Sequence, residues 1–136
     1  MNSKRENHRL AVTFLVVALG VFALPANAVH DLSPAVIIEW NALAQRHVAG
    51  PPFAQTRSFA MVHVAMADAV VAIEDGYHPF HVTTRAPGGA SAEAAAAQAA
   101  HDVLVFLAPG ATAASDAALA TRLADIAKTL RCIRDS

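Results

Sequence analysis

Hydrophobic residues recur at three- and four-residue steps along much of this chain, a spacing typical of α-helices. In the first such segment, from position 34 to about 48, they fall on one side of the predicted helix: Val36, Ile37, Trp40, Leu43 and Ala44. Ser33 and Pro34 form a cap and first-turn pair, and Gly50-Pro51-Pro52 should stop the helix. This segment predicts an amphipathic helix with one buried face.

The second segment, residues 53–75, is apolar around nearly its whole circumference. A helix without a polar face needs neighbours on every side, so this pattern predicts the central helix of a bundle, ended by Gly76. About sixty residues follow it, which is little material with which to enclose such a helix. The mismatch indicates part of a larger helical protein.

Two further helices are expected after a proline- and glycine-rich loop at positions 77–89. Ser91 should cap an alanine-rich helix that runs to about Leu107. After Pro109-Gly110, Ser115-Asp116 should open a fourth helix with a narrow apolar stripe of Leu119, Leu123, Ile126 and Leu130, and with outward-facing Arg122, Asp125 and Lys128. No alternating strand pattern competes, so the predicted class is all-α: a helical bundle fragment of about four helices.

The N-terminal segment, residues 1–28, has the three regions of a secretory signal peptide. Lys4, Arg5 and Arg9 form the positive region, the apolar run spans positions 10–24, and Ala26-Asn27-Ala28 is a small-x-small cleavage site. We expect cleavage before Val29 and export to the periplasm or the medium. The competing interpretation is an uncleaved anchor, because the apolar run approaches the length of a membrane-spanning helix.

Composition and charge exclude one class of partner. The chain is 55% hydrophobic and 15% charged, with a net charge of −1. A nucleic-acid-binding protein would show clustered lysine and arginine, whereas the basic residues here are widely spaced until the last few positions. We therefore expect no nucleic-acid partner, and the signal peptide would engage the membrane only during export.

Several polar residues have the types needed for a site, but each has a plainer explanation. His78 and His81, close to Tyr77, lack the third and fourth ligands of a zinc site. His63 is expected to be a buried histidine with one hydrogen-bond partner rather than a base. Asp68 and Arg57 should each pair with a different neighbouring helix.

Two more candidates are weaker. His101-Asp102 combines a base with a carboxylate that could orient it, but adjacent residues on a helix are not expected to face each other. Cys132 is a single cysteine near the end of the chain, with no histidine close to it in sequence, so a catalytic role is not expected.

The order of the segments resembles one family. Asp31-Leu32-Ser33-Pro34-Ala35 precedes the Trp40-Asn41-Ala42-Leu43 block, and Ala60-Met61-Val62-His63 lies in the second helix. Together with the proline–glycine loop and the alanine-rich helix, this order over residues 31–126 looks like the N-terminal helical part of secreted vanadium-dependent haloperoxidase-like proteins. These belong to the type 2 phosphatidic acid phosphatase superfamily.

The resemblance implies a phosphate or vanadate site held by a lysine, two arginines, a serine, a glycine and a histidine. In the family these groups lie in Arg-Pro, Pro-Ser-Gly-His and Ser-Arg blocks of the C-terminal half. None of the blocks occurs in this chain, so the sequence assigns no catalytic, cofactor-binding or metal-binding residue to it. Residues 29–136 are therefore expected to be the N-terminal helical part of a haloperoxidase-like domain without its catalytic C-terminal half.

Two hypotheses about function remain. In the first, the chain is part of an exported haloperoxidase-like or acid-phosphatase-like protein and is inactive alone because it lacks the oxyanion site. In the second, it is a small exported helical scaffold or binding protein without catalysis. The second hypothesis takes the exposed apolar face of residues 53–75 as the contact surface, through which helix–helix association would occur.

Overall fold

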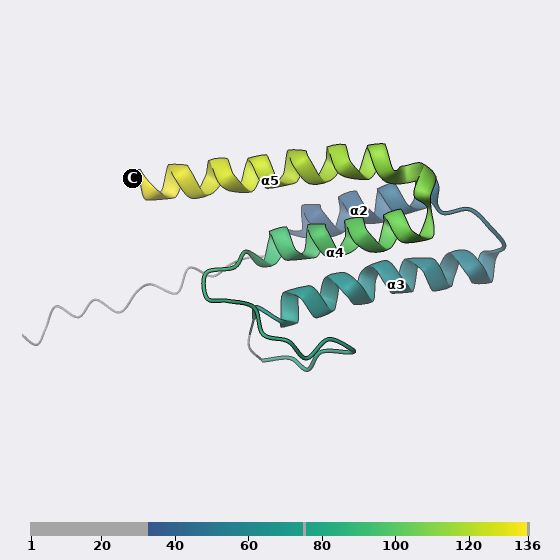
Figure 1. Cartoon of the computed structure of the whole chain (residues 1–136), viewed down its shortest axis with the longest axis horizontal. Helices are drawn as coiled ribbons and strands as arrows, with labels where there is room; N and C mark the ends of the chain where they lie inside the picture. The colour runs from purple at the N-terminus through teal and green to yellow at the C-terminus, as the bar shows by residue number, and fades with distance from the viewer. Residues whose placement is uncertain (1–32, 75, 136) are drawn as a thin grey trace, which may run out of the picture.

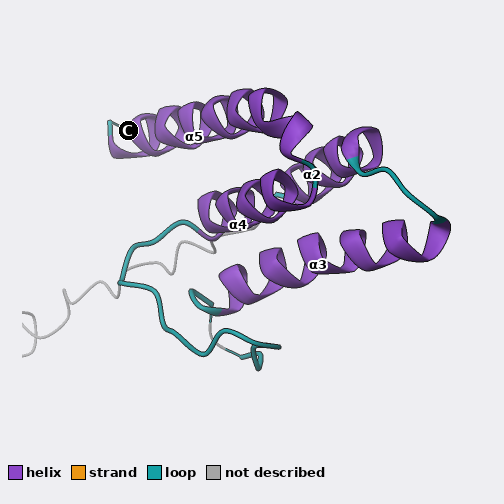
Figure 2. Cartoon of the chain, turned by 45° about the vertical axis from the view of Figure 1, so that its right-hand side comes forward, coloured by secondary structure: helices purple, strands orange, loops and turns teal. Residues whose placement is uncertain are grey.

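The computed structural model describes residues 33–74 and 76–135, and the predicted signal peptide lies outside these residues. The described chain forms four α-helices: α2 (Pro34–His47), α3 (Pro52–Val71), α4 (Ala92–Leu107) and α5 (Thr112–Arg134). A short 3-10 helix, η1 (Pro109–Ala111), joins α4 to α5. No strand occurs in these two ranges, and the all-α prediction is confirmed (Figure 2).

The described helices include none that combines the length and the apolar character needed to cross a membrane.

The centre of the arrangement is α4, not the helix that the sequence predicted. It contacts α2, α3 and α5, and the views in Figures 1 and 2 agree that α3 and α5 lie on opposite sides of it. The alanine content of α4 explains this position, because Ala96, Ala97 and Ala100 are fully buried and allow neighbouring helices to approach closely. The prediction that residues 53–75 form the central helix is wrong for the described structure.

The hydrophobic core lies between α2, α3 and α4. Trp40 of α2 and Leu104 of α4 are fully buried, and Val62 and Met66 of α3 pack in the same cluster. This cluster uses the predicted inner face of the first helix, since Val36, Leu43 and Ala44 are also buried. Among the α3 side chains, however, only Val62, Met66 and Asp68 are buried.

Both serine caps occur where the sequence predicted them. The Ser33 hydroxyl accepts a hydrogen bond from the Ala35 N–H at 3.3 Å, and the Ser91 hydroxyl accepts one from the Ala94 N–H at 3.2 Å. Gly50, with a φ of 132°, provides the turn between α2 and α3. These local signals therefore give the starts of α2 and α4 correctly.

Two predicted boundaries are wrong. Helix α3 ends at Val71, with Ala72 as its C-cap, rather than at Gly76. Helix α5 begins at Thr112 rather than at Ser115, because η1 continues directly into it. Ser115 is fully buried inside the helix and does not cap it.

The predicted stripe on α5 is covered only in part. Leu119 packs against the core and Ile126 is half-buried, whereas Leu123 and Leu130 are 40% and 53% exposed. Arg122, which was predicted to face outward, instead reaches Glu39 of α2 and Glu93 of α4. The two carboxylates supply the partners that a half-buried guanidinium needs, and this ion-pair cluster attaches α5 to the rest of the bundle.

Candidate functional site

The main concave surface of interest is an apolar groove between α3 and α4, with a volume of about 490 Å³. We call it the α3/α4 groove. Helix α3 lines it at positions three, four and seven apart along one face, and the 80–82 loop segment closes one end. Its lining residues are Met61, Val64, Ala65, Asp68, Ala69, Ala72, Phe80, His81, Val82, Ala99, Asp102 and Val103.

A smaller hollow of about 250 Å³ continues the groove toward the start of α3. It is lined by Ala54, Arg57, Ser58, Met61, Phe106 and Leu107, so the two hollows share Met61. From Ala54 to Ala72 the chain advances by 18 residues, or about 27 Å along a helix. The two hollows therefore lie along the same wall, α3, and meet at Met61; we call them together the channel, which is mostly apolar but includes Arg57 and Ser58.

Asp68 fixes the loop that closes this channel. Its carboxylate accepts backbone hydrogen bonds from Phe80, His81 and Val82 at 2.6, 2.8 and 3.0 Å, and the residue is only 4% exposed. These bonds, first of all the one from Val82, hold the pKa of the Asp68 carboxyl below its ordinary value. The expectation that Asp68 pairs with a neighbouring helix is wrong: its partners are three loop amides.

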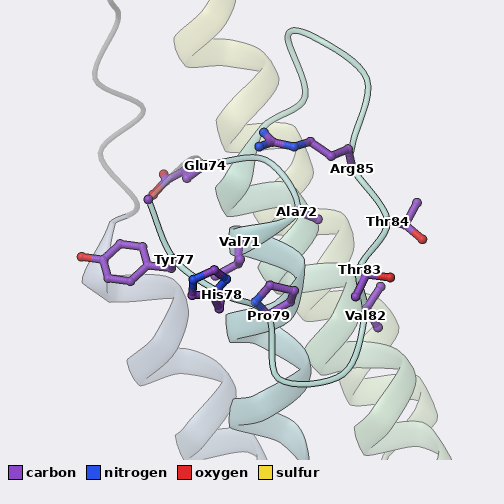
Figure 3. Close-up of a pocket in the computed structure, with 11 residues that line it drawn as sticks. Val71, Ala72, Glu74, Tyr77, His78, Pro79, Val82, Thr83, Thr84 and Arg85 are labelled. Carbon is purple, nitrogen blue, oxygen red and sulfur yellow. The ribbon is translucent and has the colours of Figure 1, made fainter.

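The rest of the same loop surrounds a second cavity of about 430 Å³ (Figure 3). The Ala86 N–H donates to the Ala72 carbonyl at 2.8 Å, which ties the far side of the loop to the end of α3. In Figure 3, Tyr77 and His78 lie on one side of the loop, and Arg85 extends across it from the other.

The two loop histidines do not converge. His78 lines the loop cavity, whereas His81 lines the α3/α4 groove. In the described ranges no three histidine, cysteine, aspartate or glutamate side chains are grouped so that they could hold a metal ion. His78 and His81 therefore belong to two different surfaces.

The remaining predicted residues have separate surroundings. The Nε2 atom of His63 lies 3.2 Å from Oδ1 of Asn41, which confirms the expected hydrogen-bond partner, although His63 is only half-buried. Arg57 is exposed and lines the smaller hollow. Cys132 is exposed near the end of α5.

His101 contacts two carboxylates, although the sequence predicted no contact between His101 and Asp102. Its Nδ1 lies 2.8 Å from Oδ1 of Asp102, and its Nε2 lies 2.8 Å from Oδ1 of Asp116 on α5. The expectation that the adjacent pair does not meet is wrong, because the carboxylate of Asp102 reaches along the helix surface to the ring. Asp116 lies fifteen positions away and becomes a neighbour only when α5 folds back beside α4, so no local signal predicts it.

The α3/α4 groove is chemically suited to binding an apolar helix. Alanines on both walls permit close approach, while Met61, Val64 and Val103 supply apolar surface. The groove places one carboxylate, Asp102, at its rim, and the other, Asp68, is saturated by loop amides. Comparison with protein-family models, with curated proteins and with solved structures finds no match for this chain.

Proposed function

We propose that this chain is the helix-packing part of an exported haloperoxidase-like or acid-phosphatase-like protein. In this proposal the α3/α4 groove receives an apolar helix from the part of the protein that carries the oxyanion site. The observation that carries the proposal is that α3, apolar on nearly all sides, is covered on one side only. By itself the chain supplies packing surface rather than catalysis.

The shape of the groove supports a helix as its occupant. The lining residues of the two hollows run along α3 from Ala54 to Ala72, a stretch of about 27 Å that corresponds to a helix of about 18 residues. Small side chains at Ala65, Ala69 and Ala99 leave room for an incoming helix to approach the backbone closely. An extended peptide would need free edge amides to pair with, and helices α3 and α4 use theirs internally.

The energetics support the same occupant. Phe106, which lines the smaller hollow, is 77% exposed, and Phe80, which lines the groove, is 82% exposed. Fully burying one such side chain contributes about 1.5–3 kcal/mol, so covering both of them favours association and offsets part of its entropic cost. Exposed aromatic residues at both ends of an apolar channel are typical of an interaction surface.

Charge supports the assignment of the oxyanion site to another part of the protein. The resemblance implies two arginines and a lysine around a phosphate or vanadate. Arg122 is already engaged by Glu39 and Glu93, so it is not available to neutralise a bound anion. Because the chain also lacks the Arg-Pro and Ser-Arg blocks that hold the family's arginines, the proposal assigns the cations of that site to the segment that carries the covering helix.

Dye binding tests whether the groove is open. Anilinonaphthalene sulfonate, which fluoresces on apolar protein surface, is expected to bind the chain and to bind Ala65→Glu much more weakly, because Ala65 lines the groove. Ala67→Glu is the matched control, since Ala67 is an exposed alanine on the same helix and does not line the groove. No fluorescence with the native chain, or equal loss in both variants, would contradict the proposal.

A second function, that of an exported helical scaffold or binding protein, is favoured by one observation. Arg122 links α2, α4 and α5 through internal ion pairs, which is expected if these helices hold together without a covering partner. This function predicts a monodisperse chain that unfolds cooperatively. The first predicts that the α3/α4 groove binds a segment that carries Arg-Pro and Pro-Ser-Gly-His blocks.

A further inference from the structure

A histidine bridges two helices through both of its ring nitrogens. Nδ1 of His101 lies 2.8 Å from the Asp102 carboxylate on α4, and Nε2 lies 2.8 Å from the Asp116 carboxylate on α5. The His101 side chain is 16% exposed, whereas the two aspartates are 65% and 61% exposed. A sheltered imidazole thus connects two solvated carboxylates on different helices.

The number of protons on the ring decides whether this bridge is stable. A neutral imidazole carries one N–H and one lone pair, so it can donate to only one of the two carboxylates. The other nitrogen would then direct its lone pair at an ionised oxygen 2.8 Å away, which is repulsive. The imidazolium form carries two N–H groups and donates to both aspartates, so the observed geometry fits the protonated ring.

We propose that His101 is a pH-controlled latch that fastens the first turns of α5 to α4 when the ring is protonated and releases them when it is neutral. The latch acts at one end of α5 only. Arg122 with Glu39 and Glu93 attaches α5 further along the helix, and Ala114, Ala118 and Leu119 pack against the core. Release is therefore local, and α5 stays attached in its middle.

The groups that face His101 agree with this role. On α5 the facing ionisable group is Asp116, and on α4 it is Asp102, whose Oδ1 also accepts from the Gln98 amide at 2.8 Å. Helix α2 presents the uncharged ring of Trp40, edge to face with the imidazole at 6.3 Å between centroids. The bond to Asp116 raises the pKa of His101 above its ordinary value, partial burial opposes this, and Asp102 raises it further.

The direction of the pH effect follows from linkage. A pKa raised in the folded state means that the latch contributes its full stability below the ordinary histidine value of 6.5. That contribution is lost as the pH rises through the folded-state pKa of His101. The first turns of α5 should therefore be held most firmly in mildly acidic surroundings and loosened in alkaline ones.

Two measurements on the 136-residue chain test the latch. The first is an NMR titration of the His101 ring, in which the pKa should lie above 6.5 and should fall toward that value in Asp116→Asn. Asp116 is largely exposed, so this variant should fold normally. A native pKa at or below 6.5, or one that Asp116→Asn leaves unchanged, would overturn the proposal.

The second measurement is amide hydrogen exchange in the first turns of α5 at about pH 5.5 and about pH 8.5, on either side of the histidine range, corrected for intrinsic rates. Protection should fall at the higher pH in the native chain and in His78→Gln, an exposed loop control. It should lose its pH dependence in His101→Gln. Equal pH dependence in all three proteins would also overturn the proposal, and if His101→Gln does not fold, the Asp116→Asn titration decides the question.

Discussion

Arg122 on α5 donates from Nε to Oε2 of Glu39 on α2 at 3.2 Å, across 83 positions of sequence. A second guanidinium nitrogen reaches the same oxygen, and Nη1 donates to Glu93 of α4 at 3.3 Å. The three side chains are 19%, 33% and 22% exposed. One cation therefore ties three helices together at a partly sheltered position.

Removing that cation should destabilise the bundle. Arg122→Ala leaves Glu39 and Glu93 without their shared partner, and we expect a loss of about 1–2 kcal/mol, above the range of exposed ion pairs because the group is multidentate and partly buried. Chemical denaturation followed by circular dichroism measures it. Lys128→Ala, on the exposed side of the same helix, should change the unfolding free energy by less than about 0.5 kcal/mol. Equal losses of unfolding free energy in the two variants would show that the Arg122 ion pairs do not stabilise the bundle.

Asp68→Asn should release the loop from α3. An amide side chain keeps one acceptor oxygen but loses the charge that receives three backbone N–H bonds. Exchange at the amides of residues 80–82 should become about tenfold faster, as expected when hydrogen bonds to a charged acceptor are weakened. The exchange rates of the α4 amides in the same sample serve as the internal control.

The Asp68 carboxylate also predicts how the protection of the loop amides changes at acidic pH. The pKa of Asp68 is lowered from its ordinary value of 3.8, so its stabilising contribution is present above pH 3.8 and is lost as the pH falls through the folded-state pKa. Amides 80–82 in the native chain should lose protection in that acidic range. In Asp68→Asn they should show no such acid step, and an identical step in both proteins would contradict the assignment.

Substitutions of Trp40 compare the stability lost with buried volume and the stability gained by removing an unsatisfied N–H. It is fully buried, and its indole Nε1 has no hydrogen-bond partner. Trp40→Ala should cost about 3–5 kcal/mol through lost contacts and a cavity. Trp40→Phe should cost distinctly less, because it keeps much of the aromatic volume and removes an unsatisfied N–H. Denaturation by urea measures both variants, and equal costs would mean that the aromatic volume kept by Phe restores no stability at this position.

The second half of α5 should tolerate polar substitution. Leu130 is 53% exposed, so Leu130→Asn should alter the unfolding free energy by no more than about 0.5 kcal/mol. Leu104→Ala, at a fully buried position on α4, should cost about 2–5 kcal/mol. A large loss in Leu130→Asn would instead indicate that the apolar stripe on α5 is covered in solution.

Local signals in the sequence were sufficient for the fold class and for much of the helix layout. Ser33 and Ser91 predict helix starts because a serine hydroxyl satisfies an otherwise unpaired N–H, and that chemistry depends only on nearby residues. The inner face of α2, with Trp40 and Leu43, follows from spacing alone. The two wrong boundaries lie where a turn continues the helical path, as η1 does before Thr112.

The α3/α4 groove and the two polar clusters were less predictable, because each joins residues that are far apart in sequence. Asp116 meets His101 only through the reversal between α4 and α5, and Arg122 meets Glu39 only through packing around α4. Which helix lies at the centre also depends on how closely the neighbouring helices can approach it. Buried alanines such as Ala96 and Ala100 allow close approach to α4, whereas the sequence pattern predicted that the apolar α3 would be central.

The most direct test of the proposed function is to express the 136-residue chain together with the C-terminal half of a vanadium-dependent haloperoxidase-like protein, the half with the Arg-Pro and Pro-Ser-Gly-His blocks, and to measure whether the two copurify. We predict a stoichiometric complex that is weakened by Ala65→Glu and unaffected by Ala67→Glu. A folded chain that retains no such half, or a complex weakened equally by both variants, would contradict the assignment of the α3/α4 groove to the catalytic half of a haloperoxidase-like or phosphatase-like protein.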